Sequence, residues 1–230
     1  MMATLGPGLG FAQTATTNDP RPLVSVEVRM VLMPRETAAE LFEPEVTLGR
    51  VGVIKQETLR KLQQLVAKKK ATILCQPQVT TVSQNTAQIK TVKEIRYPTE
   101  FSPASQMAGT NVATNAGADG GTICFPGGFE TREVGTLLNV TPTVMSDGTR
   151  IQLTLVPELA EQLANSKFEV SPRGKRFVEQ PRFRSRQITT TVVMKSGTTI
   201  LLGVADPVEG EEDKNQVTLI FLTSTIVSLE

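Results

Sequence analysis

The side chains that could carry out chemistry in this sequence are carboxylates and thiols, because its 230 residues include no histidine. This absence excludes triads with an imidazole base and removes the commonest transition-metal ligand. Carboxylates can act as acid and base or bind Ca²⁺, but their spacing here matches no known ligand pattern. The candidates are Glu158, Glu161, Glu209, Glu211, Glu212 and Asp213. An exposed acidic loop explains the run from 209 to 213 more simply, so we expect no enzyme and no metal or cofactor site.

The two cysteines, Cys75 and Cys124, lie far apart in the sequence and form no CxxC pattern. They supply too few ligands for a zinc site. One interpretation is a disulfide formed in an oxidising compartment. The other is two unlinked thiols packed as small apolar side chains, and the sequence leaves both open.

The charge of the chain is balanced, with 24 lysines and arginines against 23 aspartates and glutamates. A balanced chain does not attract nucleic acid through its overall field, so we expect no nucleic-acid partner. No run of about 18 apolar residues is present, which excludes a membrane-spanning helix. A chain of this kind crosses a membrane only as part of a closed barrel.

The first elements are a lead-in, a strand and a helix. Residues 1–22 are rich in Gly, Thr and Pro, which indicates a disordered lead-in or the remnant of a secretory signal. From Val24 to Leu32 apolar residues alternate with polar ones, as in a half-buried strand. Residues 56–70 place leucines at helical spacing and predict a helix with Lys68, Lys69 and Lys70 in its last turn.

Strand patterns dominate the rest of the chain. The segments 71–82 and 86–95 are rich in β-formers and flank a turn at Ser83–Asn85. Between 102 and 128 the composition changes to Gly, Ala, Ser, Asn and Thr, typical of a long functional or disordered loop. Two hairpins are predicted, 134–145 with 150–156 around a turn at 146–148, and 187–194 with 198–204 around 195–197. A final strand is predicted at 217–227. These patterns predict a mainly β chain with one or two helices.

Several segments, taken in order, resemble the barrel core of bacterial secretins. Secretins are the outer-membrane channels of type II and type III secretion systems and of type IV pili. The residues that fall on the family pattern are Pro77, Val134, Gly135, Leu138, Val140, Pro142, Asp147, Gly148 and Pro157. The chain departs from the pattern with Ser224 in place of a proline and with a short polar loop before the last strand. The resemblance therefore indicates a truncated or divergent member of the family.

The resemblance implies a barrel subunit, built from long antiparallel hairpins, that closes only by joining identical subunits in a ring. It divides the chain into a lead-in strand and helix at 23–70 and a barrel core at 71–230. Segment 102–128 would be a gate inside the channel lumen, and its glycines would act as hinges. These hinge candidates are Gly117, Gly120, Gly121, Gly127 and Gly128. The cargo would be a secreted protein or a pilus, and the location the bacterial outer membrane.

Segment 160–183 lies where the family builds a lip that contacts outer-membrane lipid. The candidates for lipid contact are Phe168, Val170, Phe177, Val178 and Phe183. A soluble loop with a basic face explains the same segment equally well. The alternative function for the whole chain is a soluble periplasmic β-domain that binds a pilus or envelope partner without forming a pore.

Overall fold

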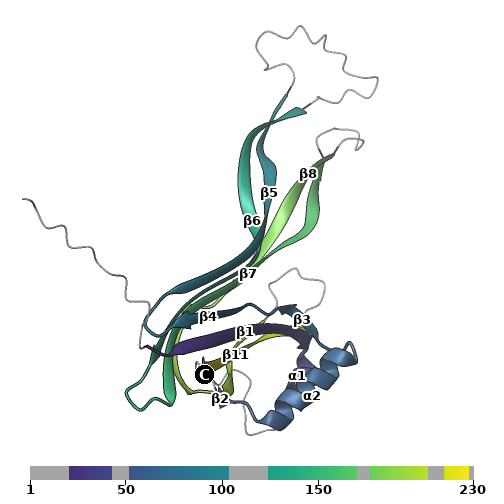
Figure 1. Ribbon diagram of the computed structural model, residues 1–230. Helices are drawn as coiled ribbons and strands as arrows, with labels where there is room; N and C mark the ends of the chain where they lie inside the picture. The colour runs from purple at the N-terminus through teal and green to yellow at the C-terminus, as the bar shows by residue number, and fades with distance from the viewer. Residues whose placement is uncertain (1–20, 43–51, 104–123, 170–176, 207–214, 228–230) are drawn as a thin grey trace, which may run out of the picture.

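The computed structural model describes residues 21–42, 52–103, 124–169, 177–206 and 215–227. These residues form two antiparallel sheets and two helices, α1 (Arg35–Leu41) and α2 (Gln56–Ala67) (Figure 1). The strands are β1 (Leu23–Pro34), β2 (Gly52–Val53), β3 (Thr72–Cys75), β4 (Gln78–Val82), β5 (Ala87–Pro103), β6 (Cys124–Val144), β7 (Arg150–Glu169), β8 (Phe177–Gln187), β9 (Thr190–Lys195), β10 (Thr198–Ala205) and β11 (Gln216–Val227).

The first sheet, which we call the base sheet, has the order β2-β10-β11-β1-β3, with β4 also paired to β1. Strand β1 pairs with β11 along its whole length, from Leu23 opposite Val227 to Pro34 opposite Gln216. On its other side β1 pairs with β3 and β4. The predicted lead-in strand is therefore central to a sheet that also holds the last strand of the chain.

The second sheet, which we call the hairpin sheet, has the order β5-β6-β7-β8, with β9 paired to β7 beyond the end of β8. Its lower part packs face to face on the base sheet. Alternate residues of β1, from Val24 to Met30, are fully buried there against Leu138, Leu153 and Leu155. Burial of an apolar side chain of this size stabilises a fold by about 1.5–3 kcal/mol.

The two helices cover part of the other face of the base sheet. Leu62 of α2 and Leu41 of α1 pack there with Val31 and Met33 of β1. The β1–β3 pairing shifts register between Met30 and Val31, and these two consecutive residues are both buried, one in each core. The base sheet thus lies between the helices and the hairpin sheet.

The predicted mainly β fold with antiparallel hairpins is confirmed, as are the strand at 24–32, the turn at 83–85 and the final strand. The predicted hairpin of 187–194 with 198–204 is wrong, because β9 pairs with β7 in the hairpin sheet and β10 pairs with β11 in the base sheet. The predicted end of the second helix is wrong, because α2 stops at Ala67 and its last turn contains no basic residue. Lys69 has a φ of 58°, which ends the helix and turns the chain toward β3. The lysines at 68–70 therefore follow the helix.

The hairpin strands are longer than predicted. Strand β5 continues to Pro103 and β6 begins at Cys124, so both ends of the predicted loop 102–128 are strand. Strand β7 continues to Glu169 and β8 begins at Phe177, inside the segment 160–183. Most residues of these extensions are exposed or half-buried, and without a fully buried face the period-two apolar pattern is weak. Residues 1–20 lie outside the described part, and the division of the chain at residue 70 stays a prediction.

Candidate functional site

The candidate site is the pair of long hairpins, β5–β6 and β7–β8. Strands β6 and β7 pair from Val144 opposite Ile151 to Gly135 opposite Ala160. Beyond that pair each hairpin continues alone, β5–β6 to the pair Pro103–Cys124 and β7–β8 to the pair Glu169–Phe177. Figure 1 shows the two hairpins extending separately above the base sheet.

Gly135 lies where the two hairpins part. Its φ is 139°, a conformation that L side chains rarely adopt, and a Cβ built on it would lie 2.2 Å from the Thr91 carbonyl oxygen on β5. The neighbouring strand therefore occupies the space that a side chain would need. Only glycine fits this position without displacing backbone.

Side chains join the hairpins beyond the last backbone pair. The rings of Tyr97 on β5 and Phe183 on β8 have centroids 5.4 Å apart, tilted by 50°. The Arg132 guanidinium on β6 lies 5.0 Å from the centre of the Phe183 ring, a cation–π contact. The Tyr97 hydroxyl donates a hydrogen bond of 3.1 Å to Glu130, its cross-strand partner.

The strand faces that meet show on which side of the β5–β6 hairpin the β7–β8 hairpin lies. Tyr97 and Arg132 lie on the face of β5–β6 that carries Leu138, which packs toward the base sheet. Phe183 points away from Arg186, which shares a face with the buried Leu159. Tyr97 and Arg132 thus face the base-sheet side, whereas Phe183 faces the opposite way. Because these side chains are in contact, the β7–β8 hairpin must lie on the base-sheet side of the β5–β6 hairpin.

An ion-pair cluster joins β7 to β8 just beyond the Gly135–Ala160 pair, where the two hairpins separate. Glu161 on β7 accepts hydrogen bonds from the Arg184 guanidinium at 2.9 and 3.1 Å and another from Arg186. The Arg186 side chain is only 9% exposed. The cluster holds the base of the β7–β8 hairpin together where β6 no longer supports it.

The lower hairpin sheet presents an uncharged polar row on the face opposite the core. Thr86 contacts Thr141 at 2.8 Å between hydroxyl oxygens, and Thr154 contacts Thr191 at 3.1 Å. Thr141 and Thr154 are themselves cross-strand partners, so the four threonines form one row. The same face also carries the exposed Lys90–Glu133 ion pair and Glu158, which bonds to Ser185, whereas the other face is buried.

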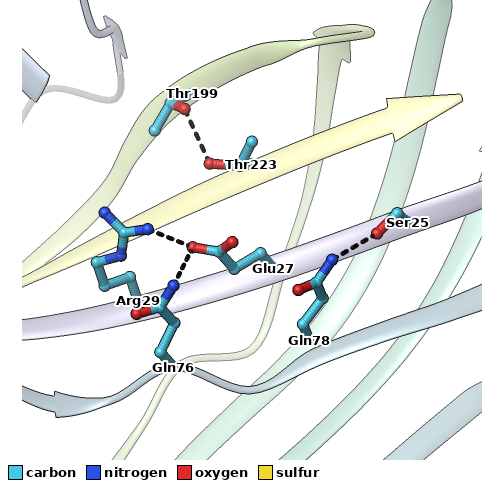
Figure 2. A network of polar contacts seen from close by, with 7 residues as sticks. All are labelled: Ser25, Glu27, Arg29, Gln76, Gln78, Thr199 and Thr223. Carbon is cyan, nitrogen blue, oxygen red and sulfur yellow. Dashed lines mark hydrogen bonds and ion pairs between the residues drawn. The ribbon is translucent and has the colours of Figure 1, made fainter.

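A second polar network lies on the base-sheet face that points away from the hairpin sheet (Figure 2). Glu27 accepts hydrogen bonds from Arg29 at 2.7 Å and from the Gln76 amide at 2.9 Å. The Arg29 Nε atom is buried and has no hydrogen-bond partner within the described ranges. The other members of the network are Ser25, Gln78, Thr199 and Thr223.

The structure places the predicted lipid-contacting residues on both faces of the β7–β8 hairpin. Phe168 and Val178 are cross-strand partners and share one face, whereas Phe177 and Phe183 lie on the other face of β8. Phe168 and Phe177 are 53% and 54% exposed. Val170 lies outside the described residues, so the predicted set does not form one continuous surface.

Of the predicted gate hinges, Gly127 and Gly128 lie in β6 near its start. Gly128 has a φ of 51°, and a Cβ on it would lie 3.0 Å from the Thr99 side chain. Gly127 has open space around it. Gly117, Gly120 and Gly121 fall outside the described ranges.

Cys75 has a free thiol. Burial raises its pKa, and a hydrogen bond with the Thr136 side chain partly opposes that rise. The side chain of Cys124 lies outside the description. Within the described residues there is no group of three metal-ligating side chains, and no helix is long and apolar enough to cross a bilayer.

Comparison with known proteins identifies the family. The model of the secretin family, described as bacterial type II and III secretion system protein, matches residues 64–205. The chain belongs to the secretin family. Secretins are channel proteins rather than enzymes, and their homologues are outer-membrane channels of the cell envelope. None of the curated proteins compared with the sequence matches it.

Solved secretins show a similar but distant arrangement. The secretin-domain β-barrel of InvG from the Salmonella SPI-1 injectisome has a TM-score of 0.46 and 11% identity, covering 91% of this chain and 64% of InvG. The type II secretin GspD from enteropathogenic Escherichia coli has a TM-score of 0.43 and 16% identity, with 91% and 70% covered. The competence-pilus secretin PilQ from Vibrio cholerae has a TM-score of 0.45 and 15% identity, with 93% and 63% covered. This secretin chain thus spans about two thirds of these relatives.

The residues assigned from the sequence to the secretin pattern have physical roles in the lower part of the fold. Leu138 and Val140 are buried between the sheets, with Val134 farther along β6. The three prolines each accept a hydrogen bond at their carbonyl oxygen from a backbone N–H group of another segment. The donors are Val28 for Pro77, Gln84 for Pro142 and Ile188 for Pro157. Asp147 accepts the backbone N–H groups of Thr149 and Arg150 at 3.0 and 3.1 Å, and Gly148 has the φ of 66° that this turn needs.

Sequence reasoning missed the contacts between the hairpins of this secretin. Nothing in the spacing of Tyr97, Arg132 and Phe183 indicates that they meet, because they lie on three strands. The sequence offers Glu161 only as a candidate acid or metal ligand. The signal that could have identified its role was the alternation of Arg184 and Arg186, which places both on the same strand face.

Proposed function

We propose that this chain is a subunit of a homo-oligomeric outer-membrane secretin channel that passes a secreted protein or a pilus. The observation that carries the proposal is the open hairpin sheet. Strand β5 forms one edge, and β8 with β9 forms the other, and neither edge pairs with a further strand among the described residues. Long open edges are hazardous in water and unfavourable in lipid.

Identical copies offer a geometrically consistent way to close these edges. Neighbouring strands from β5 to β8 run antiparallel, so β5 and β8 run in opposite directions. The β8 edge of one copy can therefore pair antiparallel with the β5 edge of the next, and repetition around a ring yields a closed barrel. The two edge strands of each single hairpin also run in opposite directions. Beyond Gly135, the β5–β6 hairpins of all copies can therefore close into one barrel wall and the β7–β8 hairpins into a second wall around it.

The gate is assigned to residues 102–128 at the end of the β5–β6 hairpin. This hairpin lies on the side of β7–β8 away from the base sheet, and the polar threonine row lies on the same side. We take that side as the lumen, because its threonine hydroxyls and exposed ion pairs such as Lys90–Glu133 suit a water-filled channel, whereas the opposite face of the lower hairpin sheet is buried against the base sheet. Gly135 would let the gate-bearing hairpin leave the common sheet.

The membrane lip is assigned to the outward face of the β7–β8 hairpin. Phe168 and Val178 share this face, and Arg182 follows on the same face of β8. An apolar pair near the tip with an arginine below it fits an aromatic anchor in lipid and a guanidinium at headgroup level. The location of the assembly would then be the bacterial outer membrane.

The test is conductance in planar lipid bilayers of protein purified from membranes. Wild-type rings should conduct poorly because the gate is closed, and deletion of residues 104–123 should raise single-channel conductance severalfold. Deletion of residues 170–176 is the matched control, since it shortens the other hairpin tip and should lower insertion frequency without widening the pore. A protein that stays monomeric in plain buffer and never conducts, even without residues 104–123, would contradict the channel and support a soluble periplasmic binding domain.

A further inference from the structure

The two sides of the base sheet lie beside the two edges of the hairpin sheet. Strand β4 leads into β5 through residues 83–86, where Gln84 donates a hydrogen bond to the Pro142 carbonyl of β6. On the other side, β9 leads into β10 through a short turn, where Ser196 donates to the Thr149 carbonyl beside β7. The β3–β4 side of the base sheet therefore lies at the β5 edge, and the β2–β10 side lies at the β8–β9 edge.

The base sheet is wider than the hairpin sheet and extends beyond it at β2. Among the described residues the base sheet is five strands across, from β2 to β3, and the hairpin sheet is four, from β5 to β8. At about 4.8 Å per strand these widths are about 24 Å and about 19 Å. Val53 on β2 is opposite Ile200 and shares its face, which points toward the hairpin sheet. Val53 is nevertheless 67% exposed, whereas Ile200 is 4% exposed, so the hairpin sheet of the same copy does not reach under β2.

In the proposed ring, the strand that continues the hairpin sheet at this edge is β5 of the next copy. This strand carries Ile89 on the face toward the base sheet, because Ile89 is opposite the buried Leu138. Val79 on β4 faces the same core, since it is opposite the buried Val26. Both Ile89 and Val79 are only half-buried, because they lie at the open side of the core. The next copy thus offers an apolar surface where β2 has none beneath it.

We propose that Val53 packs on Ile89 and Val79 of the next copy, so that the apolar cores between the two sheets become continuous around the ring. The inference rests on the proposed function, because it takes the ring in which the β5 edge meets the β8–β9 edge of a neighbour. It adds an interface that barrel closure alone does not contain. The base sheet of each copy holds the hairpin sheet of the next, beside the backbone pairing of the barrel wall.

This contact differs in kind from the pairing in the barrel wall. Neighbouring strands of the base sheet are antiparallel, so across its five described strands the two edges, β2 and β3, run in the same direction. Strand β2 is also only two residues long. A parallel ladder from β2 to a neighbouring copy would therefore hold few hydrogen bonds. The outer layer joins the copies through burial of apolar side chains instead.

Cysteine cross-linking of the full chain, assembled in membranes, tests the contact. Val53→Cys and Ile89→Cys are combined in a chain that also carries Cys75→Ser and Cys124→Ser, and a flexible bismaleimide is added. Links between neighbouring copies give a ladder of covalent oligomers on a denaturing gel. The matched control carries Lys90→Cys in place of Ile89→Cys, because Lys90 is the next residue of β5 and lies on the opposite face.

We expect the ladder from the pair of Val53 and Ile89 and no ladder from the control. If the cysteine chains do not assemble, two valine variants decide. Val53→Gln should lower the fraction of rings that survive heating in detergent severalfold, because it places an amide against apolar side chains. Val193→Gln changes a valine that is 51% exposed on the lumen face of β9, and it should lower that fraction little.

Rings that give no ladder, or equal losses in the two valine variants, would overturn the contact at Val53. Absence of rings in the wild type would instead overturn the proposed channel.

Discussion

Gly135 and Ala160 are the last cross-strand pair between β6 and β7, and the two hairpins separate from that pair onward. Strand β6 therefore belongs to the common sheet on one side of Gly135 and to a free hairpin on the other. A residue at such a position must tolerate both an unusual backbone conformation and a close neighbour. Gly135 meets both demands, with a φ of 139° and the Thr91 carbonyl in the place of a side chain.

Gly135→Ala should destabilise the fold by about 3 kcal/mol or more, because backbone strain and overlap with Thr91 add together. Urea unfolding of the full chain measures this. Gly148→Ala has the positive φ but open space, so it should cost about 1–2 kcal/mol. Gly127→Ala has open space and no such φ and should change stability by about 0.5 kcal/mol or less. Equal costs for all three would contradict the close approach at Gly135.

Glu161→Gln should destabilise the base of the β7–β8 hairpin by about 2 kcal/mol, because it leaves two poorly solvated guanidinium groups without their shared carboxylate. Thermal unfolding followed by circular dichroism tests this. The matched control is Glu179→Gln, which breaks the exposed pair with Lys167 on the same hairpin and should cost about 0.5 kcal/mol or less. If the two variants unfold alike, the cluster does not fasten the hairpin as we describe.

Asp147 gives the β6–β7 turn a defined pH dependence. Its hydrogen bond with the Arg150 side chain, and then those with the Thr149 and Arg150 backbone, hold the pKa of the carboxyl well below its usual range. Because the folded pKa is below the unfolded one, the stabilisation is complete above the ordinary Asp value of about 3.9 and is lost as pH falls below it.

Asp147→Asn keeps an oxygen that can accept the backbone N–H groups but removes the charge. We expect this variant to be less stable than the wild type at pH 7, and the difference between the two to shrink toward pH 2. Unfolding curves at several pH values provide the comparison. A stability difference that stays constant between pH 7 and pH 2 would show that the carboxylate charge does not stabilise the turn.

Phe168 and Phe177 test which face of the β7–β8 hairpin meets lipid. The two side chains are similarly exposed, 53% and 54%, but lie on opposite faces. Phe168→Gln should reduce liposome association severalfold, because it places an amide in the apolar layer. Phe177→Gln should have a smaller effect. Stronger loss from Phe177→Gln would reverse our assignment of the outward face.

The sequence predicts the strands that have one buried face, but it does not predict how far the hairpins extend. The alternation in β1 is unambiguous because Val24, Val26 and Val28 face a core while polar residues face outward. Strand β7 beyond Ala160 has no such contrast, so its extension to Glu169 left no periodic signal. Sequence periodicity predicts only local structure. The aromatic contact at Phe183 depends on how two hairpins cross, and residues that are far apart in the sequence determine that crossing.

The central claim is that the β5 and β8–β9 edges remain unpaired in one copy and are closed by neighbouring copies. Electron microscopy of the protein extracted from membranes in mild detergent tests it most directly. The account predicts closed rings with density across the central opening, and the same rings with a clear centre after deletion of residues 104–123. Images and matching mass measurements that show only single copies, stable in detergent and in buffer, would contradict it.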